Sequence, residues 1–285
     1  MHISIKAETL FRFMGFPITN SVVGTLLTSV TLIILAFVVY KNLNSERPGM
    51  FQTFIEATIS FLYELTDSVS EKHAKEFFPL ITTMFLFVIV SNWYGLVPGI
   101  SAFSINHEEP MNKVHTTEVL HEEDAGAEDI NAAEVEKSYT ESGVDDHAIN
   151  AEEHVSSTPI FRAATADLNT TLALALISVI AIQYYAIKHL GIGLHLKKFF
   201  DFSSPIAFYV GILELVSEVS KIVSFAFRLF GNIFAGEVLL AVIGMIPLII
   251  PLPFLGLEIF VGFIQATVFA VLTLVFLSMA VEKHH

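Results

Sequence analysis

The 285-residue sequence contains no cysteine, one tryptophan and only 15 lysines and arginines. The absence of cysteine excludes disulfide bonds and thiolate-bound metals. The 29 acidic residues give a formal net charge of -14, so the chain lacks the basic surface that nucleic acid requires. Charged residues make up only 15% of the chain, against about 25% in typical soluble domains. We therefore expect neither a disulfide-stabilised domain nor a nucleic-acid partner.

Apolar residues are abundant instead. Hydrophobic residues make up 53% of the chain, 26 of them are phenylalanine, and the mean hydropathy is +0.64. This composition is typical of a protein embedded in a lipid bilayer. At ~20 residues per helical span, the length allows about five or six spans with their connections. The predicted fold is an all-α integral membrane protein with about five inserted helices and one interfacial amphipathic helix.

About half of the acidic residues lie in one segment, between His107 and His154. The segment has few large apolar residues and no periodicity, so we expect a solvated, disordered loop. Its five histidines could chelate a metal together with the carboxylates, but they have no fixed ligand spacing. We expect no metal ion and no cofactor.

The apolar runs, charges and prolines divide the chain into segments. We expect an external segment 1–21, a first span 22–40, an interfacial amphipathic segment 41–78, a second span 79–97, an external acidic loop 98–166, a third span 167–187, a basic loop 188–202, a long tilted helix 203–246, a Pro-rich turn 247–253 and a final helix with the C-terminus 254–285. The first span is as long as a full crossing and no small-residue cleavage pattern follows it, which favours an uncleaved helix over a signal peptide. Pro79 fits the first turn of the second span, and Asp167 fits the N-cap of the third. The short basic loop faces the cytoplasm by the positive-inside rule, which places the N-terminus outside and the C-terminus in the cytoplasm.

The last two segments are longer than a membrane is thick. No proline occurs between Pro205 and Pro247, which permits a helix of about forty residues, or ~60 Å, against a hydrocarbon core of ~30 Å. Such a helix either lies steeply tilted or breaks, for example at Gly231 and Asn232. Two over-long helices in succession predict a tilted hairpin.

Arg228 lies in the middle of the first of these helices. Arginine cannot shed its charge, and placing it in mid-membrane costs ~2.5–3.5 kcal/mol, so it marks a functional site. No acidic residue lies three or four positions away, so its counter-charge must come from another helix or another chain. Polar residues spaced three or four positions apart form one stripe on this helix: Glu214, Ser217 or Glu218, Lys221, Ser224, Arg228 and Asn232. Ion pairs within the helix, between Glu214 or Glu218 and Lys221, are the simpler interpretation of part of the stripe.

A second polar group follows the arginine. Glu237 is nine positions beyond Arg228 and about half a turn out of phase, so it points away from the stripe. Glu258 and Gln265 share one face of the final helix. If the hairpin packs Glu237 against Glu258, two carboxylates share a poorly solvated site suited to relaying protons; the alternative is a solvated pair near the outer mouth. Polar residues thus form two offset routes, one before the arginine and one after it.

The run from Arg228 to Glu237, RLFGNIFAGE, and the ending from Gln265 to Ala280 resemble subunit a of the F-type ATP synthase. NWYGLVPG at 92–99, DLNTTL at 167–172 and RPGMFQ at 47–52 support the resemblance. The resemblance implies a non-catalytic, proton-conducting subunit of a bacterial inner membrane. Its implied partners are the c-subunit ring, the peripheral-stalk b subunits and the rest of the ATP synthase complex.

The resemblance also implies roles for individual residues. Arg228 separates two half-channels and pairs with the carboxylate of the ring. Residues on the outer half-channel are Asn232, Glu237, Glu258 and Gln265; on the cytoplasmic side they are Glu214 and Ser217; supporting residues are Glu218, Lys221, Ser224, Asp167 and Asn169. Some members pair a glutamate with a histidine where this chain has Glu237 and Glu258, which leaves the proton relay open.

Two other classes of protein compete with this interpretation. A secondary transporter would use Arg228 to bind an anionic substrate, but it predicts inverted repeats and discontinuous helices in both halves, and we see no such pairing. A structural scaffold leaves the buried arginine unexplained. The chain has no Walker phosphate loop, as expected if ATP is made elsewhere in a complex.

Overall fold

The computed structural model describes residues 8–13, 15–42, 49–97, 104–107, 156–159, 162–200, 203–244 and 251–282. Most of the acidic loop lies outside the described residues. The two strands near its ends, β3 (Ser104–His107) and β4 (Ser156–Pro159), pair in a two-stranded sheet. The chain divides into one unit of residues 1–105 and 159–285 and another of residues 106–158. All helices described below belong to the first unit.

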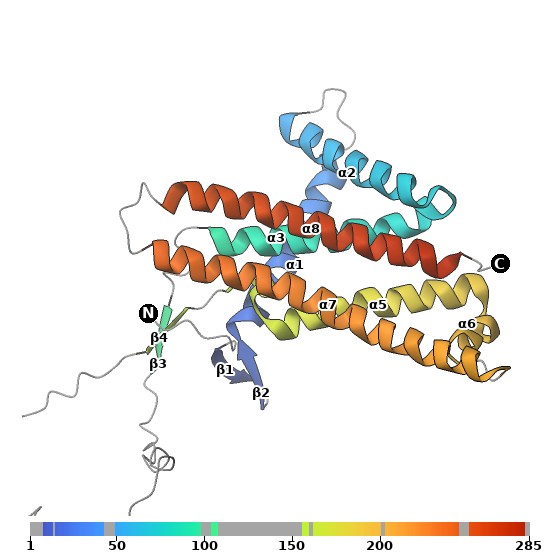
Figure 1. The fold of residues 1–285 in the computed structure, drawn as a ribbon. Coiled ribbons are helices and arrows are strands. Elements are labelled where there is room, and N and C mark those ends of the chain that lie inside the picture. Colours follow the sequence, from blue (N-terminus) through green and yellow to red (C-terminus); the bar gives the residue numbers. More distant parts are fainter. Residues whose placement is uncertain are drawn as a thin grey trace, which may run out of the picture. The chain divides into compact units, whose positions relative to one another are not determined.

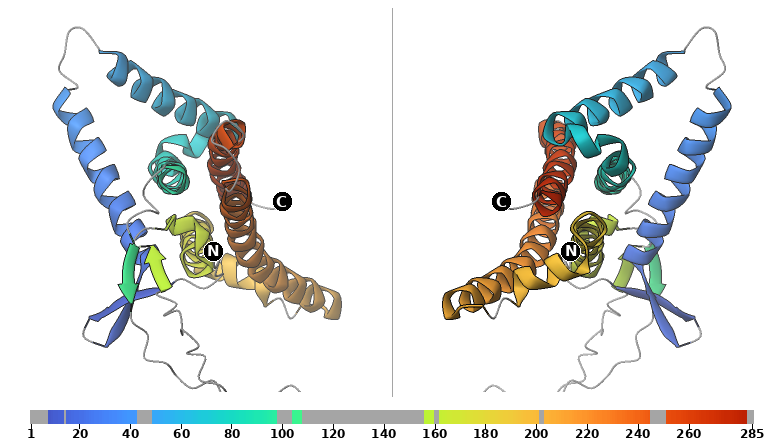
Figure 2. Two further views of the ribbon diagram at one scale, coloured as in Figure 1. Left: turned by 90° about the vertical axis from the view of Figure 1, so that its left-hand side faces the viewer. Right: turned by 90° about the vertical axis from the view of Figure 1, so that its right-hand side faces the viewer.

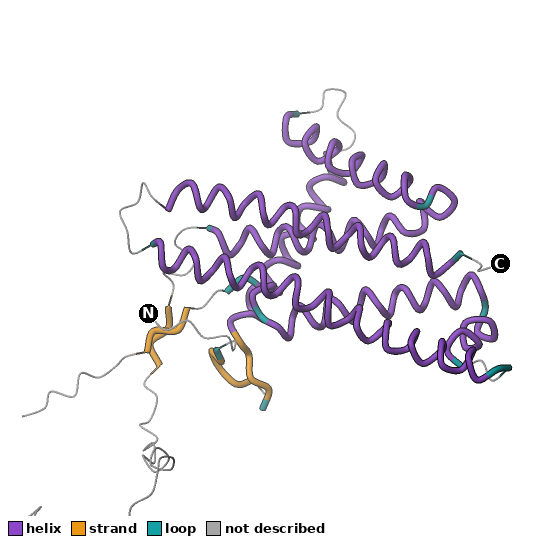
Figure 3. The backbone as a smooth tube through the Cα atoms, in the orientation of Figure 1, coloured by secondary structure: helices purple, strands orange, loops and turns teal. Residues whose placement is uncertain are grey.

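Helices make up nearly all of this unit (Figures 1 and 3). In chain order they are α1 (Asn20–Asn42), α2 (Met50–Val69), α3 (Ala74–Leu96), α5 (Leu168–Leu190), α6 (Ile192–Phe199), α7 (Pro205–Ile243) and α8 (Pro251–Val281), with short 3₁₀ helices at Glu71–His73 and Ala164–Ala166. Before them, β1 (Thr9–Phe13) and β2 (Phe16–Thr19) form an antiparallel hairpin. Among the described residues, five segments are long and apolar enough to cross a membrane: Asn20–Lys41, Glu71–Leu96, Leu168–Leu190, Pro205–Ile243 and Pro251–Val281. The chain is therefore an all-α integral membrane protein, as its composition predicted.

The helices α3, α5, α7 and α8 share one apolar core (Figure 1). Phe225 of α7 packs on Phe269 of α8, with ring centroids 5.3 Å apart. Phe77 of α3 packs edge-to-face on Tyr185 of α5, with a centroid distance of 5.2 Å. Within a bilayer, close van der Waals packing of such side chains holds neighbouring helices together. These contacts hold in place α7 and α8, which carry the polar residues selected from the sequence. The two helices form the predicted long hairpin.

Among the described residues, α1 contributes none to this core, whereas α2 packs along its edge (Figure 2). Large apolar side chains of α1, such as Ile33 and Phe37, are exposed, which suits contact with lipid. The helix α2 buries Leu62 in the core and keeps Glu56 and Glu64 on its exposed side. This division confirms the predicted amphipathic helix.

Several helix boundaries differ from the sequence expectation. The helix α7 runs unbroken through Gly231 and Asn232, which decides between the two predicted alternatives. A single glycine costs a helix only about 1 kcal/mol, too little to break one that is packed on its neighbours. The helix α8 begins at Pro251 rather than after the prolines, because a proline in the first turn lacks an N–H that would have no partner there.

Three further differences correct the expectation. The helix α3 begins at Ala74, so Pro79 lies more than one turn inside it rather than in its first turn. The predicted basic loop contains α6, because its apolar residues recur at helical spacing between the lysines. The helix α5 extends through Lys188, whose positive charge favours a helix C-terminus, to Leu190, and it is capped by Gly191 with a φ of 83° that favours glycine.

Candidate functional site

Arg228 lies on the outward side of α7. Its neighbours Phe225 and Leu229 are buried in the core, which turns the arginine away from the helix bundle. The guanidinium Nη2 donates a hydrogen bond to the Oγ of Ser224, at 3.3 Å. Within the described part of the chain, no carboxylate forms an ion pair with Arg228. The arginine therefore presents an unneutralised charge on the surface of a membrane-spanning helix.

The polar stripe before the arginine is held by two ion pairs. Lys221 Nζ lies 2.7 Å from Glu218 Oε1 on the same helix, and it also lies 4.8 Å above the ring of Phe276. This pair matches the simpler interpretation of those two residues. Glu214 pairs instead with Lys198 of α6, at 2.6 Å between Nζ and Oε1. Ser217, which lies between Glu214 and Glu218 on α7, is exposed.

His195 of α6 faces the same part of α7. Burial is the main cause that lowers the pKa of its imidazole, and the nearby positive charge of Lys198 adds to it, while Glu218 acts in the opposite direction. A lowered pKa keeps the ring neutral near pH 7. His195 thus adds a titratable group near Glu218 that sequence reasoning did not select.

Glu237, near the other end of α7, pairs with an arginine. Both Nε and Nη2 of Arg162 donate to its Oε2, each at 3.3 Å. The side chains of Arg162 and Glu237 are 10% and 26% exposed, so the pair is largely shielded from solvent. Arg162 lies just before the 3₁₀ helix that leads into α5, where its backbone carbonyl touches Gly24 of α1, a position that leaves no room for a side chain.

Glu258 and Gln265 are buried on α8, at 7% and 8% exposure. The carboxylate of Glu258 lies against Gly236, next to Glu237 in the sequence. Among the described residues the two glutamates form no hydrogen bond with each other, because Arg162 is the partner of Glu237. The side-chain amide nitrogens of Gln265 and Asn232 are both buried without a protein partner.

A network of hydrogen bonds fixes α8 on its neighbours at this level. Asn92 of α3 donates from Nδ2 to the carbonyl of Gly262, at 3.4 Å, and its Oδ1 accepts from Thr165 at 2.7 Å.

Asp167 caps α5 by accepting from the backbone N–H of Asn169 at 3.2 Å, and it also accepts from Ser21 at 2.8 Å. Asp167 is therefore a structural anchor, and Asn169 is exposed.

Comparisons with known proteins assign the chain to a family. A family model described as "ATP synthase A chain" matches residues 22–278. The chain belongs to the ATP synthase A chain family. It is 28% identical over 285 residues to the "ATP synthase subunit a" of Desulforamulus reducens, which covers 95% of this chain and 83% of that protein. It is 26% identical over 267 residues to that of Citrifermentans bemidjiense (93% and 89%) and 24% identical over 279 residues to that of Legionella pneumophila (98% and 93%).

For this member of the ATP synthase A chain family, the structure separates the selected residues into two groups. Glu214, Ser217, Glu218 and Lys221 lie on α7 before Arg228, whereas Asn232 and Glu237 follow it on α7 and Glu258 and Gln265 lie on α8. Sequence reasoning missed Arg162 and His195. The signal for Arg162 was a lone arginine five positions before the predicted third span, near the membrane, where a cation requires a partner.

Proposed function

We propose that this chain is the static proton-conducting subunit of a bacterial rotary ATP synthase, with no catalytic site of its own. Its family places it in the ATP synthase complex. The observation that carries the proposal is Arg228, which is exposed in the middle of α7 and has no acidic partner among the described residues. A fixed charge presented outward at this depth fits a counter-charge on a neighbouring subunit. We assign that counter-charge to a carboxylate of the c-subunit ring.

Asn232, Glu237, Glu258 and Gln265 line the outer half-channel in this proposal. All four are wholly or partly buried, yet they include two carboxylates and two amides. Buried polar groups almost always have a hydrogen-bond partner, so the orphaned amide nitrogens of Asn232 and Gln265 favour ordered water beside them. A row of water and carboxylates between α7 and α8 supports proton transfer, with Glu237 and Glu258 as the relay.

Glu214 and Ser217 line the second half-channel, at the opposite end of α7. Fourteen positions separate Glu214 from Arg228, which is ~21 Å along a helix. The ion pairs of Lys198 with Glu214 and of Lys221 with Glu218 hold these carboxylates in place. His195 adds a neutral imidazole that can accept a proton from a neighbouring group.

Arg228 keeps the two routes apart. A continuous row of polar groups across the membrane would leak protons, whereas a fixed positive charge repels them. An ionised ring carboxylate is stabilised opposite the guanidinium and is protonated when it enters lipid. Protons therefore cross only when the ring turns, which couples their flow to rotation.

The placement in the membrane follows from charge. Lys188, Lys197 and Lys198 lie around α6, which we place on the cytoplasmic side together with the C-terminus, and we place the N-terminal hairpin outside. The exposed apolar surface of α1 supports contact with lipid and with the peripheral-stalk b subunits.

ATP-driven proton pumping by inverted membrane vesicles tests this proposal. The variant Arg228→Ala should abolish pumping while the assembled complex still hydrolyses ATP. Lys197→Ala is the matched control, because it removes an exposed cation on α6 and should pump like the wild type. Pumping retained by Arg228→Ala would refute the proposed role.

A further inference from the structure

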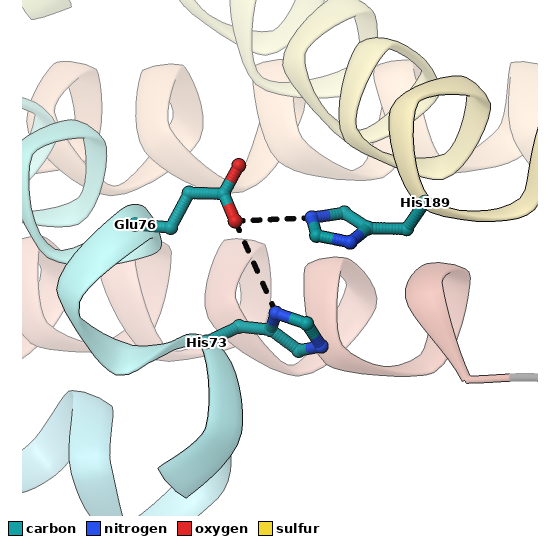
Figure 4. A group of neighbouring side chains, drawn as sticks. All are labelled: His73, Glu76 and His189. Atoms are coloured by element: carbon teal, nitrogen blue, oxygen red, sulfur yellow. Dashed lines mark hydrogen bonds and ion pairs between the residues drawn. The ribbon is translucent and has the colours of Figure 1, made fainter.

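Away from the proposed proton path, two histidines converge on one glutamate where α3 begins and α5 ends. His73 precedes α3, Glu76 lies in its first turn, and His189 lies in the last turn of α5. Figure 4 shows both imidazole rings directed at the same carboxylate oxygen. His189 Nε2 lies 3.0 Å and His73 Nδ1 3.9 Å from Glu76 Oε2. One ligand atom from each residue lies within 4.8 Å of the other two.

These distances are close to those between ligand atoms in the first coordination shell of a transition metal. A tetrahedral zinc ion with bonds of about 2.0–2.1 Å separates its ligand atoms by about 3.3 Å. The two distances from Glu76 Oε2 lie on either side of that value. Two neutral imidazoles and one carboxylate are a common zinc ligand set, and three protein ligands leave one position for water. We propose that His73, Glu76 and His189 bind one divalent transition-metal ion of the Zn²⁺ class, which ties α3 to α5.

The scaffold around the three side chains is already built. Phe77, next to Glu76, is buried and packs on Tyr185, one turn before His189, so the two helix ends are held side by side without the metal. The rings of His73 and His189 lie 4.5 Å apart between centroids. The three side chains are 30%, 28% and 23% exposed, which leaves an ion access from solvent. A preformed, accessible site requires little reorganisation on binding.

Lys188 tunes this site. Its Nζ lies 2.5 Å from Glu76 Oε1, the oxygen that the histidines do not face, and its side chain is 52% exposed. Lys188 therefore competes with a cation for the Glu76 carboxylate, and its positive charge opposes cation binding. The imidazole ligands favour Cu²⁺ and Zn²⁺ over Mg²⁺ and Ca²⁺, which prefer oxygen.

Binding of Zn²⁺ by the full chain in lipid nanodiscs, measured by equilibrium dialysis, tests the proposal. The five histidines between His107 and His154 are replaced by alanine in every sample, so that they do not compete. His73→Ala and His189→Ala should each weaken binding at least about tenfold, because even changes to outer partners of a metal cost 10–100-fold. His195→Ala, a histidine on α6 outside the cluster, should bind like the parent.

Lys188→Ala distinguishes a metal site from a general loss of structure. Removing its charge should tighten Zn²⁺ binding by about tenfold, an effect that misfolding cannot produce. Co²⁺ in place of Zn²⁺ should show four-coordinate absorption bands in the parent and lose them in His189→Ala. A parent that binds no Zn²⁺, or histidine variants that bind it equally well, would show that the cluster is an ion-pair network only. Neither result bears on the proposed proton path, because the site does not depend on it.

Discussion

The carboxylate of Glu258 occupies the space beside Gly236 where any larger residue would place its side chain. This relationship joins α7 and α8 through a buried acid and a missing Cβ. The contact explains why α7 has a glycine at position 236, directly before Glu237, since a larger residue there would collide with Glu258. The glycine lets the two helices approach closely enough for Glu258 and Glu237 to lie in one region of the interface.

Gly236→Ala should therefore destabilise the chain. The added methyl group meets the Glu258 carboxylate and overpacks the interface, which typically costs about 1–3 kcal/mol. Gly231→Ala is the matched control, because nothing lies within 4 Å of its added Cβ and alanine favours a helix by about 1 kcal/mol over glycine. The unfolding temperature of the purified chain should fall for Gly236→Ala and not for Gly231→Ala. Equal changes in the two variants would contradict the close contact.

The pair of Arg162 and Glu237 predicts strong coupling between the two residues. Arg162→Ala leaves a largely buried carboxylate without its partner, which should cost about 1–3 kcal/mol of stability. Adding Glu237→Gln should recover much of that loss, because the orphaned charge is then gone. A double-mutant cycle on unfolding midpoints measures the coupling, and strictly additive effects would mean that the contact contributes nothing.

His195 predicts a pH dependence at the contact of α6 with α7. Its pKa is lowered in the folded chain, mainly by burial, so the unfolded chain binds a proton more readily. The stability contributed by the neutral ring is fully present above its ordinary pKa and is lost as pH falls from that value through the lowered pKa of the folded chain. His195→Gln should lose less stability than the wild type between pH 7 and pH 5, and parallel curves for the two proteins would exclude this role.

Glu258→Gln tests the proposed relay. The amide keeps the shape of the carboxyl but cannot take up a proton, so proton flux through the assembled complex should fall by on the order of tenfold or more. The subunit content of the purified complex serves as the assembly control. Wild-type flux in this variant would make Glu258 a structural residue only.

Local sequence patterns predicted the helices and the polar stripe because both depend on residues close in sequence. Hydrophobic runs marked the five spans, and the spacing of three residues between Glu218 and Lys221 predicted that they lie on one side of a helix. Pairs that join distant segments had no such periodic signal. Arg162 and Glu237 are 75 positions apart, and His189 is 113 positions from Glu76. Which side chains meet across helices depends on how α5 packs on α3 and α7, and no single-helix pattern encodes it.

The proton permeability of vesicles that contain the Arg228→Ala complex tests the central claim most directly. If Arg228 separates two half-channels, removing its charge should let protons pass without rotation. An imposed pH gradient should then decay faster than in wild-type vesicles, with ATP synthesis abolished. Arg228→Lys, which keeps a charge but not the planar guanidinium, should leak less than Arg228→Ala. A gradient that decays at the wild-type rate in Arg228→Ala vesicles while ATP synthesis continues would contradict the account.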